Sequence, residues 1–490
     1  MSANVSRLAM LVFVGGIAAL SFRPVGTSAQ PAAVDPAWPK WRQAIVEPNK
    51  IYNISDNTIS SIKFTFPGGT IPQQFSNSDG AAGTGQTIFG YGGGAYFRGV
   101  GKHGVIVFGS GGENFAGNMT GALRLDGDLA HYEVWQQPIY RTQAEPGAEF
   151  YWNPKEAEKL PAQRQFPLLK FDKAKWDGKF PLALGGWVYP APVKYVEPAE
   201  GVPLGQYRYD QHCFIPAEHT GLKAGVWFIP SAHFMAPGFY YGIDMALCAD
   251  FWPAGKKKWY AHYQREDTKS WTRLETPVPE PIGPGSFSSQ VVGYSTKHRK
   301  VVVPLQGPRG ETGVFDVSQG IAKGEWSVKA SPKQGNGQAQ LRCGQKSAMS
   351  NGHPRNRAYF VWYTGDYGKP PTGLNVLDLY DPSYPIHTVK LPTLKGIGER
   401  VGLHYIPSLD RFISFGVGGN PDQAYCQKIT IPDKLDDTAA YTVEDVPLTL
   451  APGVDLGTSY TNSGMVQYLE QLNCIVFLAV GKPAKAFVVK

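Results

Sequence analysis

The clearest pattern in the chain is a short apolar run, a glycine-rich turn and a second short run. The residues Val105 to Phe108 are all apolar, the turn Gly109 to Gly112 follows them, and a second run ends at Asp126. A third short run covers His131 to Trp135. β-Branched and aromatic runs that alternate with glycine-rich turns are typical of hairpins. The sequence therefore predicts antiparallel sheet as its building unit.

The same pattern recurs in six units along the chain. Each full unit holds four short runs over about 45–60 residues, which is the period of propeller blades. The first unit covers about 88–138. The strands expected in the later units are 209–216, 225–230, 243–248 and 259–263; then 290–294, 300–305, 313–317 and 326–328; then 345–349, 358–363, 373–379 and 387–391; then 402–406, 411–417, 424–431 and 441–446; and last 464–469, 473–480 and 485–489.

The sixth unit has only three runs, and an incomplete blade would expose unpaired backbone groups. The early run at 50–54 can supply its fourth strand, and a further short run lies at 62–66. We therefore expect an all-β fold, a single propeller of six four-stranded blades closed by this N-terminal strand. A seventh blade within 30–90 or 139–206 stays open. Residues 139–206 lack the pattern and are either an insertion across one face or a degenerate repeat.

Composition supports this architecture and adds an export signal. The 490 residues include 57 glycines and 40 prolines, and 13% are aromatic, as expected of many short strands joined by turns. Arg7, the apolar run 8–20 and the small residues 27–29 resemble a signal peptide over 1–29, which leaves 30–490 as the propeller domain. We expect a secreted or periplasmic protein, with an uncleaved anchor as the alternative. No other run is long enough to cross a membrane.

Charge and cysteines narrow the function classes. The net charge of +7 falls to +5 without residues 1–29, which carry two arginines, and no basic cluster is dense enough to indicate nucleic acid. The five cysteines are widely spaced, with no metal-ligand pattern. We expect mostly buried thiols, although one or two bridges stay open, and we expect no metal, no cofactor and a monomer.

Two stretches resemble a known group of proteins. They are the hairpin from Val105 to Asn118 and the run Tyr209-Asp210 followed after five residues by Pro216. The blades over 88–490 are similar to kelch-like, galactose-oxidase-type propellers of exported bacterial proteins, and distantly to ulvan-lyase-type polysaccharide lyases. Glu113 stands where many such propellers carry a histidine, and Arg208-Tyr209-Asp210 matches their second motif only at its tyrosine and aspartate. The resemblance implies a polysaccharide ligand.

Candidate site residues are expected where loops converge on one face of the propeller. These loops precede the first strand of each blade or join its second and third strands. Candidates for acid–base chemistry are Tyr209, His233 and Glu113. Candidates for ligand binding are Arg208, Arg342, Arg400, Tyr240, Tyr460 and Asn114.

Each group of candidates has a structural alternative. The aromatic loop 231–241 either stacks on sugar rings or fills a blade interface. The three arginines either bind an anion at the channel mouth or form separate surface ion pairs. Tyr209 is either an acid or base, or a core residue. Glu113 is either an acid or base, or a cap on its own turn.

Two functions follow from these candidates. In the first, the propeller recognises a polymeric saccharide on one face, with anionic polymers favoured, and has a binding or scaffold role. In the second, it is a polysaccharide lyase, in which a tyrosine–histidine pair moves the proton and arginine neutralises the uronate carboxylate.

Overall fold

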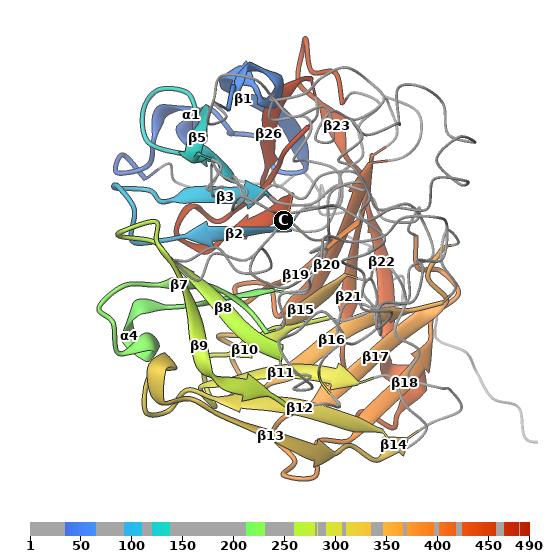
Figure 1. Cartoon of the computed structure of the whole chain (residues 1–490). Helices are drawn as coiled ribbons and strands as arrows, with labels where there is room; N and C mark the ends of the chain where they lie inside the picture. The colour runs from blue at the N-terminus through green and yellow to red at the C-terminus, as the bar shows by residue number, and fades with distance from the viewer. Residues whose placement is uncertain are drawn as a thin grey trace, which may run out of the picture.

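The structure is a computed structural model. It describes residues 35–64, 93–109, 120–137, 212–230, 259–279, 282, 291–305, 310–334, 346–365, 370–395, 401–417, 424–456, 465–479 and 481–490. Six antiparallel sheets of four principal strands follow one another around an axis in these ranges (Figure 1). The predicted all-β propeller of six blades is confirmed.

The first three blades are formed in chain order. Blade 1 consists of β2 (Gly93–Phe97), β3 (Val105–Gly109), β4 (Thr120–Arg124) and β5 (His131–Gln136). Blade 2 consists of β6 (Cys213–Ile215), β7 (Val226–Ile229), β8 (Trp259–Arg265) and β9 (Trp271–Val278), with the short helix α4 (Ala217–Thr220) between its first two strands. Blade 3 consists of β10 (Gly293–Ser295), β11 (Lys300–Leu305), β12 (Glu311–Asp316) and β13 (Glu325–Ala330).

The next two blades follow the same order, and blade 4 has one additional strand. Blade 4 consists of β15 (Ser347–Met349), β16 (Tyr359–Thr364), β17 (Gly373–Asp378) and β18 (Ile386–Lys390), and β14 (Lys333–Gln334) runs parallel to β18. Blade 5 consists of β19 (Val401–Ile406), β20 (Arg411–Val417), β21 (Ala424–Thr430) and β22 (Thr442–Val446).

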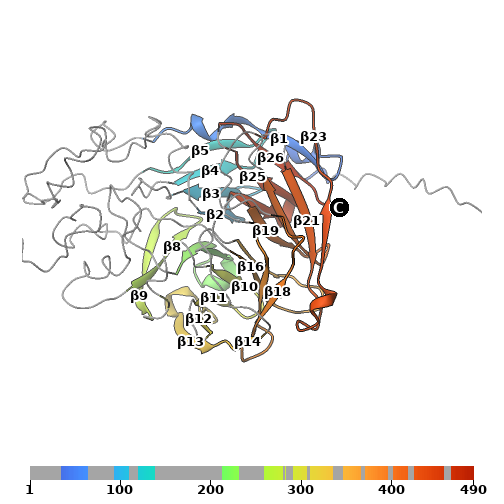
Figure 2. The same ribbon diagram turned by 90° about the vertical axis from the view of Figure 1, so that its right-hand side faces the viewer.

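Blade 6 joins the two ends of the described chain. It consists of β24 (Val466–Leu469), β25 (Cys474–Phe477), β26 (Pro483–Phe487) and the N-terminal strand β1 (Lys50–Thr58), with β23 (Thr449–Leu450) beside β1. Strand β1 is antiparallel to β26, with Tyr52 opposite Ala486. The ring closure predicted from 50–54 is therefore confirmed, and the blue and red ends of the chain lie side by side in both views (Figures 1 and 2).

The N-terminal segment also fastens the seam between blades 1 and 6. In the helix α1 (Lys40–Gln43), the Trp41 indole donates to the Leu125 carbonyl of blade 1 at 2.8 Å. The buried Arg42 guanidinium donates to the Leu472 carbonyl of blade 6 at 2.6 Å. Residues 41–64 share one apolar cluster with both blades. The seam therefore combines strand pairing, hydrogen bonds and apolar packing.

Burial explains why the second strands have the most apolar sequences. Strands β3 and β16 are buried at every position because each is covered on both faces by neighbouring blades. Fourth strands are more polar, as in β22, where only Val446 is buried. In blades 1, 3, 5 and 6 the residue before the second strand has a left-handed conformation: Gly104, Arg299, Asp410 and Asn473. The turn between the first and second strands thus ends in the same backbone conformation in these four blades.

The predicted hairpin from Val105 to Asp126 is confirmed as β3 paired with β4. In blade 2, the order expected from the sequence is wrong. The run 259–263, expected to close the blade, is its third strand β8, and the fourth strand is β9. The expected strand 243–248 lies outside the described residues. The run 62–66 forms no extended strand within its described part, 62–64.

The structure also bears on the blade count and on the cysteines. The first strands contact one another around a closed ring in the order β2, β6, β10, β15, β19, β24, which leaves no place for a seventh blade between them. Cys213, Cys426 and Cys474 are buried free thiols, as expected. The remaining two cysteines, the signal peptide 1–29 and the insertion 139–206 lie outside the described residues. No helix in the described ranges has the length and apolar character needed to span a membrane.

Candidate functional site: an axial pocket

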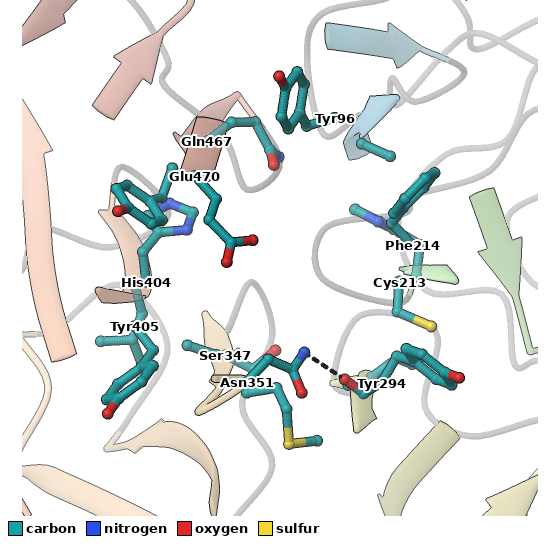
Figure 3. A pocket seen from close by; sticks show the side chains of 18 of the residues that line it. Tyr96, Cys213, Phe214, Tyr294, Ser347, Asn351, His404, Tyr405, Gln467 and Glu470 are labelled. Atoms are coloured by element: carbon teal, nitrogen blue, oxygen red, sulfur yellow. Dashed lines mark hydrogen bonds between the residues drawn. The ribbon is translucent and has the colours of Figure 1, made fainter. Parts of the chain in front are cut away.

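A pocket of about 260 Å³ lies on the propeller axis, and the first strands of all six blades line it. We call it the axial pocket. Because a propeller turns the edge of each first strand toward the axis, the pocket brings together residues that are far apart in sequence. Figure 3 shows this wall, with Tyr96 of blade 1, Phe214 of blade 2, His404 of blade 5 and Gln467 of blade 6 around the open centre.

The wall is polar on one side and more apolar on the other. Phe214, Cys213 and Tyr294, from blades 2 and 3, lie together on one side in Figure 3. Polar groups from blades 5 and 6, His404, Gln467 and Glu470, lie across the open centre from them, and Asn351 of blade 4 lies beside Tyr294, to whose carbonyl it donates at 2.8 Å. Binding sites for small molecules commonly combine apolar surface with a few placed polar groups. The pocket has this composition.

His404 is the central polar group of the wall. It lies on β19 between the buried residues Leu403 and Tyr405. Burial lowers the pKa of its imidazole to about 4, and a hydrogen bond to the backbone of Val466 offsets this only in part. The imidazole is therefore neutral at pH 7. Its Nε2 atom is buried and has no hydrogen-bond partner among the described residues.

Two side chains satisfy the edge of β2 at Gly94. The Gln467 amide of blade 6 donates to the Gly94 carbonyl at 3.1 Å. The Gly94 amide donates to Nε2 of His212, which precedes β6, at 3.3 Å. Because this nitrogen accepts a hydrogen bond, a neutral His212 carries its proton on Nδ1. Both contacts join neighbouring blades and fix the first strands around the pocket.

The end of the pocket where the first strands finish carries an ion pair. The Arg98 guanidinium follows β2, and it contacts the Glu470 carboxylate, which follows β24, at 2.9 Å. Both side chains are about half exposed. At the opposite end, before β15, lies Lys346, whose side chain is almost completely buried.

The tyrosines of the first strands mainly support the pocket. The Tyr405 hydroxyl donates to Asp410 at 2.7 Å, and the Tyr468 hydroxyl donates to Asn473 at 3.0 Å. The Tyr96 hydroxyl lies 2.8 Å from the His103 carbonyl. Burial raises the pKa of all three hydroxyls. These groups keep their protons at neutral pH and hold the strand ends in place.

The lining limits the chemistry that the described residues can perform. Glu470 is the one carboxylate in the described wall, and it is paired with Arg98. Burial raises the pKa of the Cys213 thiol, which therefore stays protonated at neutral pH. No three His, Cys, Asp or Glu side chains gather as metal ligands within the described ranges.

All nine candidate residues from the sequence lie outside the described part of the chain. They are Glu113, Asn114, Arg208, Tyr209, His233, Tyr240, Arg342, Arg400 and Tyr460. Their roles stay predictions. Sequence reasoning missed the wall residues His404, Gln467 and Glu470 because it sought the site in loops. For His404 the sequence did contain a signal, because this polar residue interrupts an apolar first strand between Leu403 and Tyr405.

Comparisons with known proteins give only distant likenesses. No family model matches the chain, and no curated protein matches it. A GH43_1 enzyme from Xanthomonas citri is 10% identical, with a TM-score of 0.28, over 50% of this chain and 76% of the other. The RS223-β-xylosidase is 10% identical, with a TM-score of 0.32, over 57% and 91%.

A third solved structure covers more of the chain. The α-L-arabinanase of Penicillium chrysogenum, complexed with arabinobiose, is 7% identical with a TM-score of 0.35 over 81% of this chain and 91% of the other. Each of these structures is of a carbohydrate-active enzyme by its description. The similarity is too low to assign a family or an activity. The fold assignment therefore rests on the strand pairing itself.

Proposed function

We propose that the protein binds a saccharide in the axial pocket. The observation that carries this proposal is the axial pocket itself, whose wall joins an apolar side at Phe214 to a polar side that includes His404 and Glu470. Saccharides supply several hydroxyl donors on a compact ring.

The two sides of the pocket match the two kinds of surface on a sugar. A sugar ring has a C–H surface, which packs on aromatic side chains, and Phe214 is a partly exposed residue on the apolar side, with its ring also against Phe97. The sugar ring also carries hydroxyl groups, which would meet the polar side of the wall, where His404, Gln467 and Glu470 lie. Polar groups placed in this way set the orientation of a ligand.

Within this proposal, an anionic saccharide is the favoured ligand. The chain has a net charge of +7, and Lys346 lines one end of the pocket. An ammonium group in a partly enclosed site attracts a carboxylate or sulfate more strongly than it would in bulk water. The candidates Arg208, Arg342 and Arg400 would add to this attraction if their loops reach the same end.

The described wall favours binding over hydrolysis. Most glycoside hydrolases use two carboxylates on either side of the scissile bond, whereas the described wall supplies only Glu470. A lyase is the second candidate, because Lys346 and His404 line one pocket and could neutralise a uronate and accept a proton. However, a pKa of about 4 makes His404 a weak base at neutral pH.

The test compares His404→Leu with a matched histidine outside the pocket. His387 on β18 also has a pKa lowered by burial, but it does not line the pocket, so His387→Gln is the control. Calorimetric titration would use xylotriose as a neutral probe and trigalacturonate as an anionic probe. We expect His404→Leu to weaken binding by about tenfold and His387→Gln to leave it unchanged.

Two outcomes would change this assignment. If the wild-type protein binds neither probe, nor any member of a wider glycan panel, saccharide binding in the axial pocket is wrong. If trigalacturonate is consumed and ultraviolet absorbance shows an unsaturated product, the protein is a lyase and binding is only its first step.

A further inference from the structure

The Arg98–Glu470 ion pair lies at the pocket, where it contributes little to the stability of the fold. It lies where β2 and β24 end, at one end of the axial pocket, and the Glu470 carboxylate points toward the open centre in Figure 3. Both side chains are about half exposed, and exposed ion pairs contribute little to folding. The position of the pair therefore suggests a role in contacting what enters the pocket.

The turn that carries Glu470 is held firmly. It is the 3₁₀ turn η7 (Glu470–Leu472), and the Tyr96 hydroxyl of blade 1 contacts the Gln471 side chain there at 3.0 Å. Arg42 donates to the Leu472 carbonyl at 2.6 Å. Because neighbours hold the turn from both sides, the carboxylate is placed before any ligand arrives, which reduces the entropy cost of binding.

The pair retains hydrogen-bonding capacity toward the pocket. The closest contact of the pair joins Oε2 of Glu470 to Nη2 of Arg98 at 2.9 Å, and both side chains are about half exposed. Beyond this contact, a carboxylate has a second acceptor oxygen and a guanidinium has further N–H donors. The pair thus offers an acceptor and several donors side by side.

We propose that the Arg98–Glu470 pair binds two adjacent hydroxyl groups of a sugar unit at this end of the axial pocket. The Glu470 carboxylate accepts a hydrogen bond from one hydroxyl, and the Arg98 guanidinium donates to the oxygen of its neighbour. Hydrogen bonds to charged groups are stronger than those between neutral groups. This inference rests on the proposed saccharide binding and makes the pair a specificity-determining element of that site.

A bound sugar carboxylate would place different demands on the same pair. It would bind the Arg98 guanidinium directly, and Glu470 would then compete with it and repel it. An amine would be attracted by Glu470 and repelled by Arg98. A hydroxyl pair, a carboxylate and an amine should therefore respond differently when Arg98 or Glu470 is removed.

The experiment measures binding of xylotriose and trigalacturonate to Glu470→Gln and Arg98→Ala by calorimetry. Glu47→Gln is the matched control, because Glu47 forms a 2.8 Å ion pair with Lys50 and does not line the pocket. We expect each pocket variant to weaken binding of both probes by about tenfold, and Glu47→Gln to have no effect. Unchanged melting temperatures would confirm that the variants are folded.

The measurements distinguish a role of the Arg98–Glu470 pair from saccharide binding in the axial pocket as a whole. If the wild-type protein binds a probe and both pocket variants bind it equally well, the pair is not a ligand site, while saccharide binding stands. Tighter binding of trigalacturonate by Glu470→Gln, together with its loss in Arg98→Ala, would replace the hydroxyl assignment with a carboxylate site. No probe binding by the wild-type protein would refute both proposals.

Discussion

At the residue scale, His404 links the pocket to the pH dependence of stability. Burial lowers its pKa from 6.5 to about 4 in the folded protein. Between these values the unfolded chain binds more protons than the folded one, so stability rises with pH. The contribution of His404 is therefore complete above pH 6.5 and is lost as the pH falls toward 4.

This linkage predicts the behaviour of His404→Gln, in which residue 404 no longer titrates. When the pH falls from about 7.5 to about 4.5, the free energy of unfolding of the wild-type protein should decrease by about 1–2 kcal/mol more than that of the variant. A fully buried histidine would give a larger difference, but water in the pocket reduces it. Urea unfolding at the two pH values measures this difference. The other histidines with lowered pKa values are common to both proteins and cancel. Equal decreases in the free energy of unfolding would show that the pKa of His404 is not lowered in the folded protein.

The same residue shows how much of the site the sequence could reveal. A polar side chain between Leu403 and Tyr405 marks an interruption in an apolar strand. Whether such a residue faces the axis or a neighbouring blade depends on how six distant strands meet, and this is a tertiary property. Loop residues such as Arg208 and Arg400 are candidates because they precede expected first strands, and their placement lies outside the described residues.

At the element scale, strand prediction succeeded where apolar runs and turns alternate without interruption. In blade 3 the run 300–305 coincides with β11, and in blade 5 the run 411–417 coincides with β20. Blade 2 was misassigned because an apolar run at 243–248 resembled a third strand. Its fourth strand, β9, has buried apolar residues only at Trp271, Leu274 and Val278, which do not alternate regularly, so hydrophobic periodicity does not mark it.

Strand β1 provides the element-scale prediction, because it pairs on both sides, with β26 and with β23. Proline has no amide hydrogen and is tolerated mainly at sheet edges. Tyr52→Pro, opposite Ala486, should therefore lower stability by about 2–3 kcal/mol more than Tyr52→Ala, which removes the same side chain but keeps the backbone donor. Thermal unfolding of the two variants tests this. Equal melting temperatures would mean that β1 is not required to close the ring.

At the scale of the whole molecule, the closed ring makes every blade a neighbour of two others. The first strands contact one another in sequence from β2 to β24 and back to β2. Blades 1 and 6 contact each other directly through β2 and β24, and residues 41–64 pack against both blades and reinforce this seam. Weakening this seam converts a ring into an open array, in which stability is carried by interfaces between nearest neighbours.

An open array should unfold from its ends, and hydrogen exchange can detect this. In Tyr52→Pro we expect amide protection to fall most in β25 of blade 6 and β3 of blade 1, which border the seam. Protection in β11 of blade 3 and β16 of blade 4, on the far side of the ring, should fall least, because local openings need not disrupt distant interfaces. Tyr52→Ala is the control and should give a smaller change with the same order. An equal loss in all four strands would show instead that the six blades open as one cooperative unit, and the seam would then control the stability of the axial pocket as a whole.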